Sequence, residues 1–138
     1  MAHLIENCLF CKIIKGVIPS VKLLETELSY AFLDIGPLSK GHALVIPKYH
    51  AEKTHQVPDE YLADILPQTR KLALAMGLTD YNILQNNGAI AHQEVMHVHY
   101  HLIPKPDEET GLKMHWKPIS QTQEELKAFA ESVSKNLK

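Results

Sequence analysis

Three histidines stand at alternate positions in one apolar stretch of the chain. His97, His99 and His101 are separated by single apolar or aromatic residues, and the stretch ends at Pro104. Read as a strand, residues 96–103 place the three imidazoles on one face, roughly 6.5–7 Å apart. A lone histidine is most often a core or surface residue, but packing gains nothing from burying three polar rings side by side. The pattern therefore predicts a site at which several imidazoles act on one ligand.

Two cysteines near the N-terminus have the spacing of a metal or redox motif. Cys8 and Cys11 enclose two residues, and thiolates so spaced supply half of a tetrahedral zinc site, with histidines as candidates for the other half. A thioredoxin-like redox pair is an alternative, although no βαβ unit places the motif where that chemistry occurs. Two ordinary buried cysteines are the third interpretation.

The composition is that of an ordinary globular domain. The 138 residues are 45% hydrophobic, which is enough apolar material for one core. The 14 Lys and Arg are interspersed with 16 Asp and Glu and the net charge is −2, so we expect neither nucleic acid nor a membrane as a partner. The N-terminus lacks the pattern of a signal peptide, and we expect an intracellular protein, cytoplasmic or nuclear.

Four further stretches are predicted as strands that could position these groups. Residues 21–25 and 29–35 form a predicted hairpin. Residues 42–47 are apolar almost throughout, which suits the centre of a sheet, and the chain reaches His50 just beyond them. Residues 81–86 make another strand, followed by a turn.

Two helices and one short helical turn are also predicted. Pro58 starts a helix that ends near residue 76, and Pro67 should kink or divide it. The short helical turn covers residues 12–15. A terminal helix follows a predicted capping box at residues 120–123, and its apolar stripe must pack on another surface. The stripe consists of Leu126, Phe129, Ala130, Val133 and Leu137.

Together these features resemble the histidine triad (HIT) family of nucleotide-binding hydrolases and transferases. Residues 97–103 fill its pattern His-φ-His-φ-His-φ-φ, in which φ is apolar. The resemblance covers about residues 6–118 and is greatest to the Hint branch. The other matching stretches are residues 8–14, 31–35, 41–50 and 84–88.

The resemblance implies a fold and an assembly. The fold is α+β, with an antiparallel sheet of about five strands and a long helix packed on it. Residues 1–138 would form a single HIT domain, with its core at about 6–118 and a C-terminal helical extension at about 120–137. Two such domains would pair as a homodimer in which the sheets join into one of ten strands.

The resemblance also implies an activity. Hint enzymes cleave the P–N bond of adenosine 5′-monophosphoramidate and of related AMP–amine or AMP–lysine conjugates. His99 would attack the α-phosphorus to give a nucleotidyl-histidine that water then hydrolyses. The backbone carbonyl of His97 would orient the His99 ring, and His101 and Gln93 would donate hydrogen bonds to the phosphate. No catalytic metal is then required.

Binding roles follow from the same resemblance. The nucleoside of a purine nucleotide would be held by Phe10, Phe32, Ile35 and Asp34, the last through the ribose hydroxyls. The groups near the phosphate or the leaving group would be Asn86, Gln93 and Glu94, with Trp116 shaping the leaving-group pocket. The chain departs from many relatives at two positions, with His92 in place of glycine and Glu94 in place of serine or threonine. In relatives that bind zinc, the metal is structural and its ligands fall at Cys8, Cys11, His50 and His97.

Two other functions remain open at this point. A dinucleoside polyphosphate hydrolase of the same family would use the same three histidines with a different pocket rim. A zinc-stabilised nucleotide-binding or scaffold protein without turnover would use the histidines only as metal ligands. A nucleotidyltransferase is disfavoured because that branch has glutamine where this chain has His101. The cysteine pair, the run at residues 46–50 and Trp116 favour the phosphoramidate hydrolase.

Overall fold

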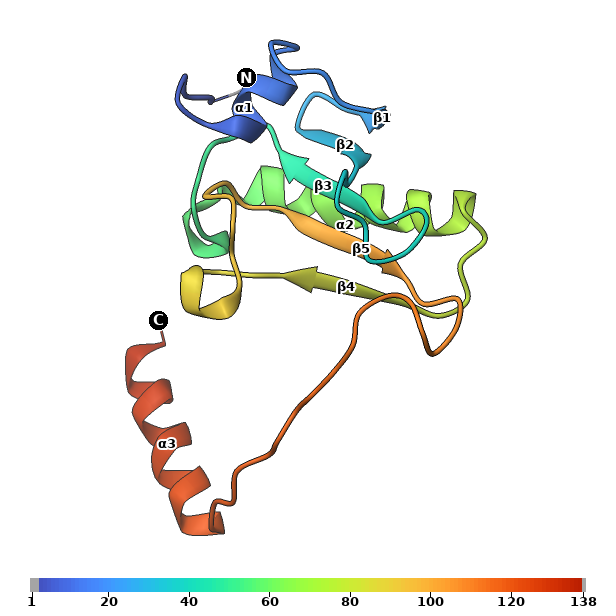
Figure 1. The fold of residues 1–138 in the computed structure, drawn as a ribbon. Helices are drawn as coiled ribbons and strands as arrows, with labels where there is room; N and C mark the ends of the chain where they lie inside the picture. Colours follow the sequence, from blue (N-terminus) through green and yellow to red (C-terminus); the bar gives the residue numbers. More distant parts are fainter. Residues whose placement is uncertain (1–2, 138) are drawn as a thin grey trace.

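The computed structural model describes residues 3–137 and has a five-stranded antiparallel sheet at its centre (Figure 1). The strand order is β1-β2-β3-β5-β4. All four neighbouring pairs are antiparallel. The α+β fold with one such sheet is therefore confirmed. The strands are β1 (Lys22–Glu25), β2 (Ser29–Leu33), β3 (Ala43–Pro47), β4 (Tyr81–Gln85) and β5 (Tyr100–Pro104).

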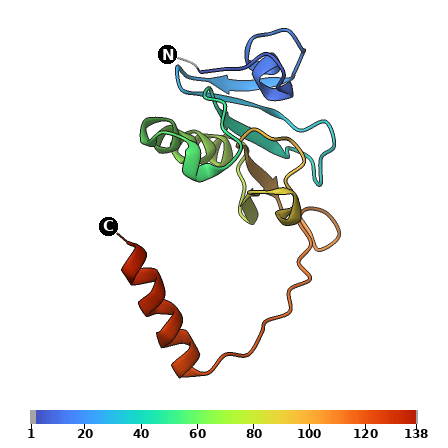
Figure 2. The same cartoon turned by 90° about the vertical axis from the view of Figure 1, so that its left-hand side faces the viewer.

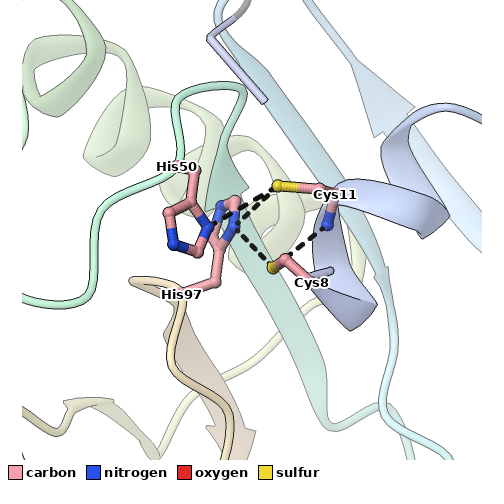
Figure 3. Close-up of side chains that lie close together, drawn as sticks. All are labelled: Cys8, Cys11, His50 and His97. Carbon is pink, nitrogen blue, oxygen red and sulfur yellow. Dashed lines mark hydrogen bonds between the residues drawn. The ribbon is translucent and has the colours of Figure 1, made fainter. Parts of the chain in front are cut away.

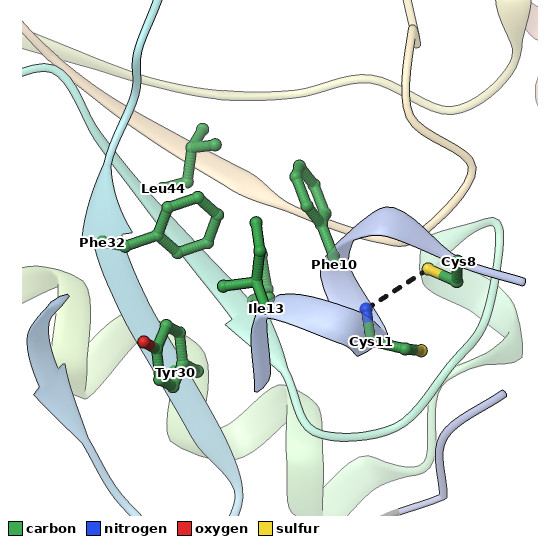
Figure 4. Packing of buried hydrophobic residues seen from close by; sticks show 8 residues of the cluster. Cys8, Phe10, Cys11, Ile13, Tyr30, Phe32 and Leu44 are labelled. Atoms are coloured by element: carbon green, nitrogen blue, oxygen red, sulfur yellow. Dashed lines mark hydrogen bonds between the residues drawn. The ribbon is translucent and has the colours of Figure 1, made fainter. Parts of the chain in front are cut away.

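Strand β3 occupies the middle of the sheet, as its sequence predicts. Every residue of this strand is buried, because α2 (Asp59–Ala75) covers one face of the sheet and α1 (Leu9–Ile14) lies against the other. The face under α2 is filled by small and branched side chains such as Val45 and Leu102. The other face carries Phe32 and Leu44 against α1, as Figure 4 shows.

The register of the sheet carries the histidine stretch to the face under α1. Leu44 pairs with Phe32 on one side and with His101 on the other, and side chains of directly paired residues lie on the same face. The His101 ring therefore lies beside the apolar residues of β2 and β3 and not under α2. The predicted alternation of side chains is kept, since Val98 and Tyr100 pack on the other face of the sheet, in a cluster that contains Tyr61 of α2.

The predicted strand at residues 96–103 is too long. Strand β5 begins only at Tyr100, and His97 and His99 lie in irregular backbone before it. The pairing with β3 stops at Val45–Tyr100, and the carbonyl of Pro47 at the end of β3 faces the His97 ring instead of a ladder partner. A hydrogen bond from the His97 side chain thus takes the place of backbone pairing between the end of β3 and the residues before β5.

Helix α2 is continuous despite its internal proline. Pro67 lies within Asp59–Ala75 and does not divide the helix, and Pro58 is its N-cap and not its first helical residue. Its acidic first turn, Asp59 and Glu60, suits the positive end of the helix dipole. No helix within residues 3–137 is long and apolar enough to cross a membrane.

The C-terminal segment leaves the body of the domain (Figure 2). Residues 112–122 run as an extended link to α3 (Gln123–Asn136), and every residue of α3 is exposed. The capping box lies two residues later than predicted, because Thr122 and Glu125 form it. The apolar stripe of α3 therefore finds no surface within residues 3–137 to cover it.

Candidate functional site

A cavity of about 240 Å³ opens on the sheet face that α1 partly covers. Its walls are mostly apolar, and its polar groups gather at one end, which is the usual character of a small-molecule site. Its apolar residues include Phe10, Ile13, Ile18, Phe32, Ile35 and Leu44, and its polar ones include Asp34, Glu94, His99 and His101. Figure 4 shows Phe10, Phe32, Ile13 and Leu44 gathered between α1 and the sheet.

His99 is buried and held through one ring nitrogen. Its Nδ1 lies 2.7 Å from the carbonyl oxygen of His97, and a carbonyl only accepts, so Nδ1 carries the proton. In the neutral ring Nε2 is therefore unprotonated and has a free lone pair. Burial lowers the pKa of His99, although the His97 carbonyl and the charges of Asp34 and Glu94 oppose the shift. The ring is thus kept in the form that can act as a nucleophile.

His101 is held by a fourth histidine, His42, which is the residue immediately before β3. The backbone N–H of Leu38 donates to His42 Nδ1 at 3.1 Å, so the proton of neutral His42 is on Nε2. That nitrogen lies 2.9 Å from His101 Nδ1 and 3.5 Å from an oxygen of Asp34. His101 therefore accepts at Nδ1 and presents an N–H at Nε2, which suits hydrogen bonding to an anion.

Burial keeps both of these rings uncharged. Desolvation lowers the pKa of His101 to about 4, with a smaller contribution from the neighbouring His99 and His42. The pKa of His42 is lowered by burial too, although the Asp34 carboxylate opposes this. At neutral pH, the Leu38 N–H therefore donates to His42, His42 donates to His101, and the remaining N–H of His101 faces the cavity.

The candidate zinc ligands meet between the start of α1, which provides the two cysteines, and the segments that follow β3 and precede β5, which provide His50 and His97 (Figure 3). The side-chain donor atoms of Cys8, Cys11, His50 and His97 all lie within 4.8 Å of one another. His97 Nδ1 is 3.4 Å from Cys8 Sγ and 3.6 Å from Cys11 Sγ, and His50 Nδ1 is 3.6 Å from Cys11 Sγ. A tetrahedron with the usual Zn–S and Zn–N bond lengths has S···N edges of about 3.5 Å, so the four donors fit this metal.

His97 joins the cysteine cluster to the nucleophile. Its Nε2 lies 2.9 Å from the Pro47 carbonyl, which assigns the proton to Nε2 and leaves Nδ1 free for a metal. Burial lowers the pKa of His97 to about 4. Its side chain thus faces the two sulfurs, while its own carbonyl orients His99.

Three residues that were predicted to face the nucleotide or its leaving group, Gln93, Asn86 and Trp116, lie outside the cavity lining. Gln93 is 3% exposed, and its amide is occupied by the backbone: Gly88 N–H donates to its oxygen, and its nitrogen donates to the carbonyls of Glu52 and Val95. Both N–H groups of this amide hold the loop, so the role of Gln93 as a donor to a phosphate stays a prediction and would require the amide to give up one of these bonds. Asn86 donates to the His92 carbonyl at 3.4 Å.

Trp116 also lies away from the cavity within its own chain. Its side chain is 79% exposed on the extended link to α3, so one chain alone does not use it to shape a leaving-group pocket. His92 is exposed at the end of the short helix Ala89–Ala91 and has φ of +70°. That left-handed conformation explains why glycine suits this position, and histidine tolerates it better than branched residues do.

The remaining predicted nucleotide-binding residues line the cavity: Phe10, Phe32, Asp34, Ile35, Glu94, His99 and His101. One oxygen of Asp34 accepts from the Gly36 N–H at 2.8 Å. His42 was assigned no role from the sequence, although a polar residue at the head of a buried apolar strand is a signal that it needs a partner.

Comparisons with known proteins agree with this geometry. An adenosine 5′-monophosphoramidase of Schizosaccharomyces pombe is 59% identical over 132 residues, which cover 96% of this chain and 99% of that protein. A protein of the same name from Saccharomyces cerevisiae is 63% identical over 88% of this chain and 76% of its own length.

Solved structures show the same fold. The crystal structure of a histidine triad nucleotide-binding protein from Candida albicans has a TM-score of 0.91 at 48% identity, and covers 94% of this chain and 96% of that chain. A HIT family protein from Bacillus anthracis matches over 100% of both chains with a TM-score of 0.90 at 38% identity. The HIT domain family matches residues 15–108. The chain therefore belongs to the HIT family.

Proposed function

We propose that this protein hydrolyses adenosine 5′-monophosphoramidate and related conjugates of AMP with amines. The observation that carries the proposal is the arrangement of His99, whose Nδ1 is held by the His97 carbonyl while Nε2 stays free beside the cavity. The names of the fungal relatives at 59% and 63% identity support the same activity.

The reaction proceeds by two displacements at the α-phosphorus. His99 Nε2 attacks phosphorus, the P–N bond to the amine breaks, and the electron pair leaves with the amine nitrogen, which takes up a proton. Water then attacks the same phosphorus, the bond to His99 breaks, and AMP and a proton are released. The Nε2–H of His101 stabilises the charge on the phosphate oxygens in both steps.

The apolar end of the cavity would hold the base of a purine nucleotide. Phe10 and Phe32 pack edge to face with ring centroids 5.6 Å apart, so both rings are fixed before a ligand arrives. The second oxygen of Asp34 has capacity left to accept from ribose hydroxyls. This division places the phosphate next to His99 and His101.

The test is AMP release by the purified protein from adenosine 5′-monophosphoramidate, without added divalent metal, beside diadenosine triphosphate. We expect the phosphoramidate to be turned over with the higher kcat/KM. Preference for the dinucleotide would identify a dinucleoside polyphosphate hydrolase. AMP binding without turnover of either substrate would contradict the proposal and leave a nucleotide-binding protein.

His42 should prove to be a positioning residue. Replacing it with Ala removes the donor to His101 Nδ1, so His101 can turn its proton inward, and we expect kcat/KM to fall about 10²-fold. His42→Gln can still donate from its amide and should recover much of the loss. The pH–rate profile separates this role from mere packing, because a change of tautomer and charge at His101 shifts the acid limb, whereas a packing defect lowers the whole curve.

We also propose that Cys8, Cys11, His50 and His97 bind a structural zinc ion. Four protein ligands leave no open position for a substrate, so the ion would stabilise the fold and take no part in the reaction. The metal would connect α1 to the segments after β3 and before β5. Zinc binding needs reduced thiols, which agrees with a cytoplasmic or nuclear location.

A homodimer joined along the sheet is proposed for the assembly. Strand β4 is an edge strand, and Ile83 on it is 45% exposed; together with α3 it leaves apolar surface uncovered. In a dimer, the link carrying Trp116 could reach the partner's cavity. Light scattering should show a dimer for the wild type and a monomer for Ile83→Glu. Val17→Glu, a matched change at an exposed position away from β4, should stay dimeric.

A further inference from the structure

A second cavity adjoins the nucleotide cavity on the side of Glu94. Its lining shares Leu9, Glu94 and Val95 with the first cavity, so the two hollows meet along one ridge. It continues past that ridge to Asn7, His50, Glu52 and Met96. The first cavity is mostly apolar, whereas this one is lined about equally by polar and apolar groups.

The reacting phosphate would sit where the two cavities approach each other. His99 Nε2 fixes the attacking side, and the apolar end with Phe10 and Phe32 takes the nucleoside. The group expelled from phosphorus must leave by the remaining opening. Glu94 stands at that opening, and a leaving amine longer than ammonia extends past it toward Glu52.

The charges at this opening have one sign. Glu52 and Glu94 are both exposed, and among residues 3–137 neither carboxylate accepts a hydrogen bond or pairs with Lys or Arg. None of the described lysines and arginines lines either cavity. A leaving group at this opening therefore meets two carboxylate side chains with no Lys or Arg beside them.

We propose that Glu94, assisted by Glu52, makes this active site select amine leaving groups that carry a second, positive charge, and reject leaving groups that carry a negative one. The selection is of leaving groups of the diamine class over those that end in a carboxylate or a phosphate. It rests on the proposed phosphoramidate hydrolysis and adds to it the charge of the preferred substrate.

Three substrates of equal length test the proposal. AMP is joined through nitrogen to 1,4-diaminobutane, to pentylamine or to 4-aminobutyrate, so that the far end is an ammonium, a methyl or a carboxylate group. In the wild type we expect kcat/KM for the ammonium substrate to exceed that for the carboxylate by about tenfold, since exposed charge pairs are individually weak. The ratio should shrink at high salt, because exposed charges are screened.

Variants assign the preference to the two carboxylates. In the double variant Glu94→Gln and Glu52→Gln, the ammonium-to-carboxylate ratio should fall to about two or below, and each single variant should lie between. Glu60→Gln on α2 makes the same change of charge on the other face of the sheet and should leave the ratio unchanged. Using the ratio within each variant cancels any general loss of activity.

The outcomes separate the two proposals. Hydrolysis of all three substrates with similar kcat/KM, or a ratio that the double variant keeps, overturns the charge selection and leaves the phosphoramidate hydrolase intact. Failure of all three, together with adenosine 5′-monophosphoramidate, overturns both.

Discussion

Replacing His99 with Ala is expected to lower kcat/KM for adenosine 5′-monophosphoramidate by at least about 10³-fold. Its imidazole combines an orientation fixed by the His97 carbonyl, burial that keeps the ring neutral and an unprotonated nitrogen with a free lone pair, whereas the unprotonated nitrogen of His101 accepts a hydrogen bond from His42. Without it, water would have to attack the phosphorus directly, and no divalent ion is proposed to help. Steady-state AMP release measures the loss.

A second variant keeps this prediction independent of folding. His99 is buried against the ring of Phe10, with centroids 5.0 Å apart, so Ala leaves a hole that could weaken the domain. His99→Asn can still donate to the His97 carbonyl but has no nucleophilic nitrogen, and should be equally inactive. Quenching the wild type in turnover with denaturant at alkaline pH should trap an AMP adduct for mass spectrometry, because the bond between phosphorus and imidazole is stable in alkali and labile in acid. Turnover by His99→Asn within tenfold of wild type would disprove the covalent mechanism.

Replacing Cys11 with Ser is expected to remove the zinc and to lower the free energy of unfolding by about 4–5 kcal/mol. The Cys11 thiol is buried, and burial raises its pKa to about 11 when no metal is near. Such a thiol is a poor redox nucleophile and becomes a thiolate only when a cation stabilises it. Metal analysis of the wild type should give one zinc per chain, and urea unfolding gives the stability.

Chelation supplies the control. A strong chelator should destabilise the wild type to the level of Cys11→Ser and should not affect the variant further. Below the unfolding transition, kcat of the variant should stay within about tenfold of wild type, since the ion touches no reacting atom. Wild-type protein without zinc and with the stability of Cys11→Ser would support two ordinary buried cysteines. A disulfide in air-oxidised wild type would support the redox pair.

The sequence predicts the sheet and the histidine alternation well, because both depend on local periodicity. The hairpin of β1 and β2 and the central β3 appear where alternation and apolar content place them. The meeting of Cys8 with His97, 89 residues apart, was implied only by the family resemblance. Periodicity contains no information about such a distance.

The errors arise where side chains compete with the backbone. The histidine strand starts late because the His97 ring takes the Pro47 carbonyl. Gln93 lies outside the cavity lining because a buried amide must satisfy its own donors and acceptor, and here the loop backbone supplies these partners. The packing of α3 could not be predicted for a different reason. An apolar stripe indicates that a helix packs against another surface, but it does not say whether that surface belongs to the same chain or to another one.

The group that orients His99 is a main-chain carbonyl, and this makes the catalytic geometry robust to mutation. Every amino acid at position 97 supplies a carbonyl, so the side chain there can be changed, and the metal lost, without removing the atom that orients His99, provided that another group replaces the His97 hydrogen bond to the Pro47 carbonyl. Stability and chemistry can therefore vary independently at a single residue. A designer seeking a zinc-free enzyme should begin at His97 and repack the space around the two sulfurs.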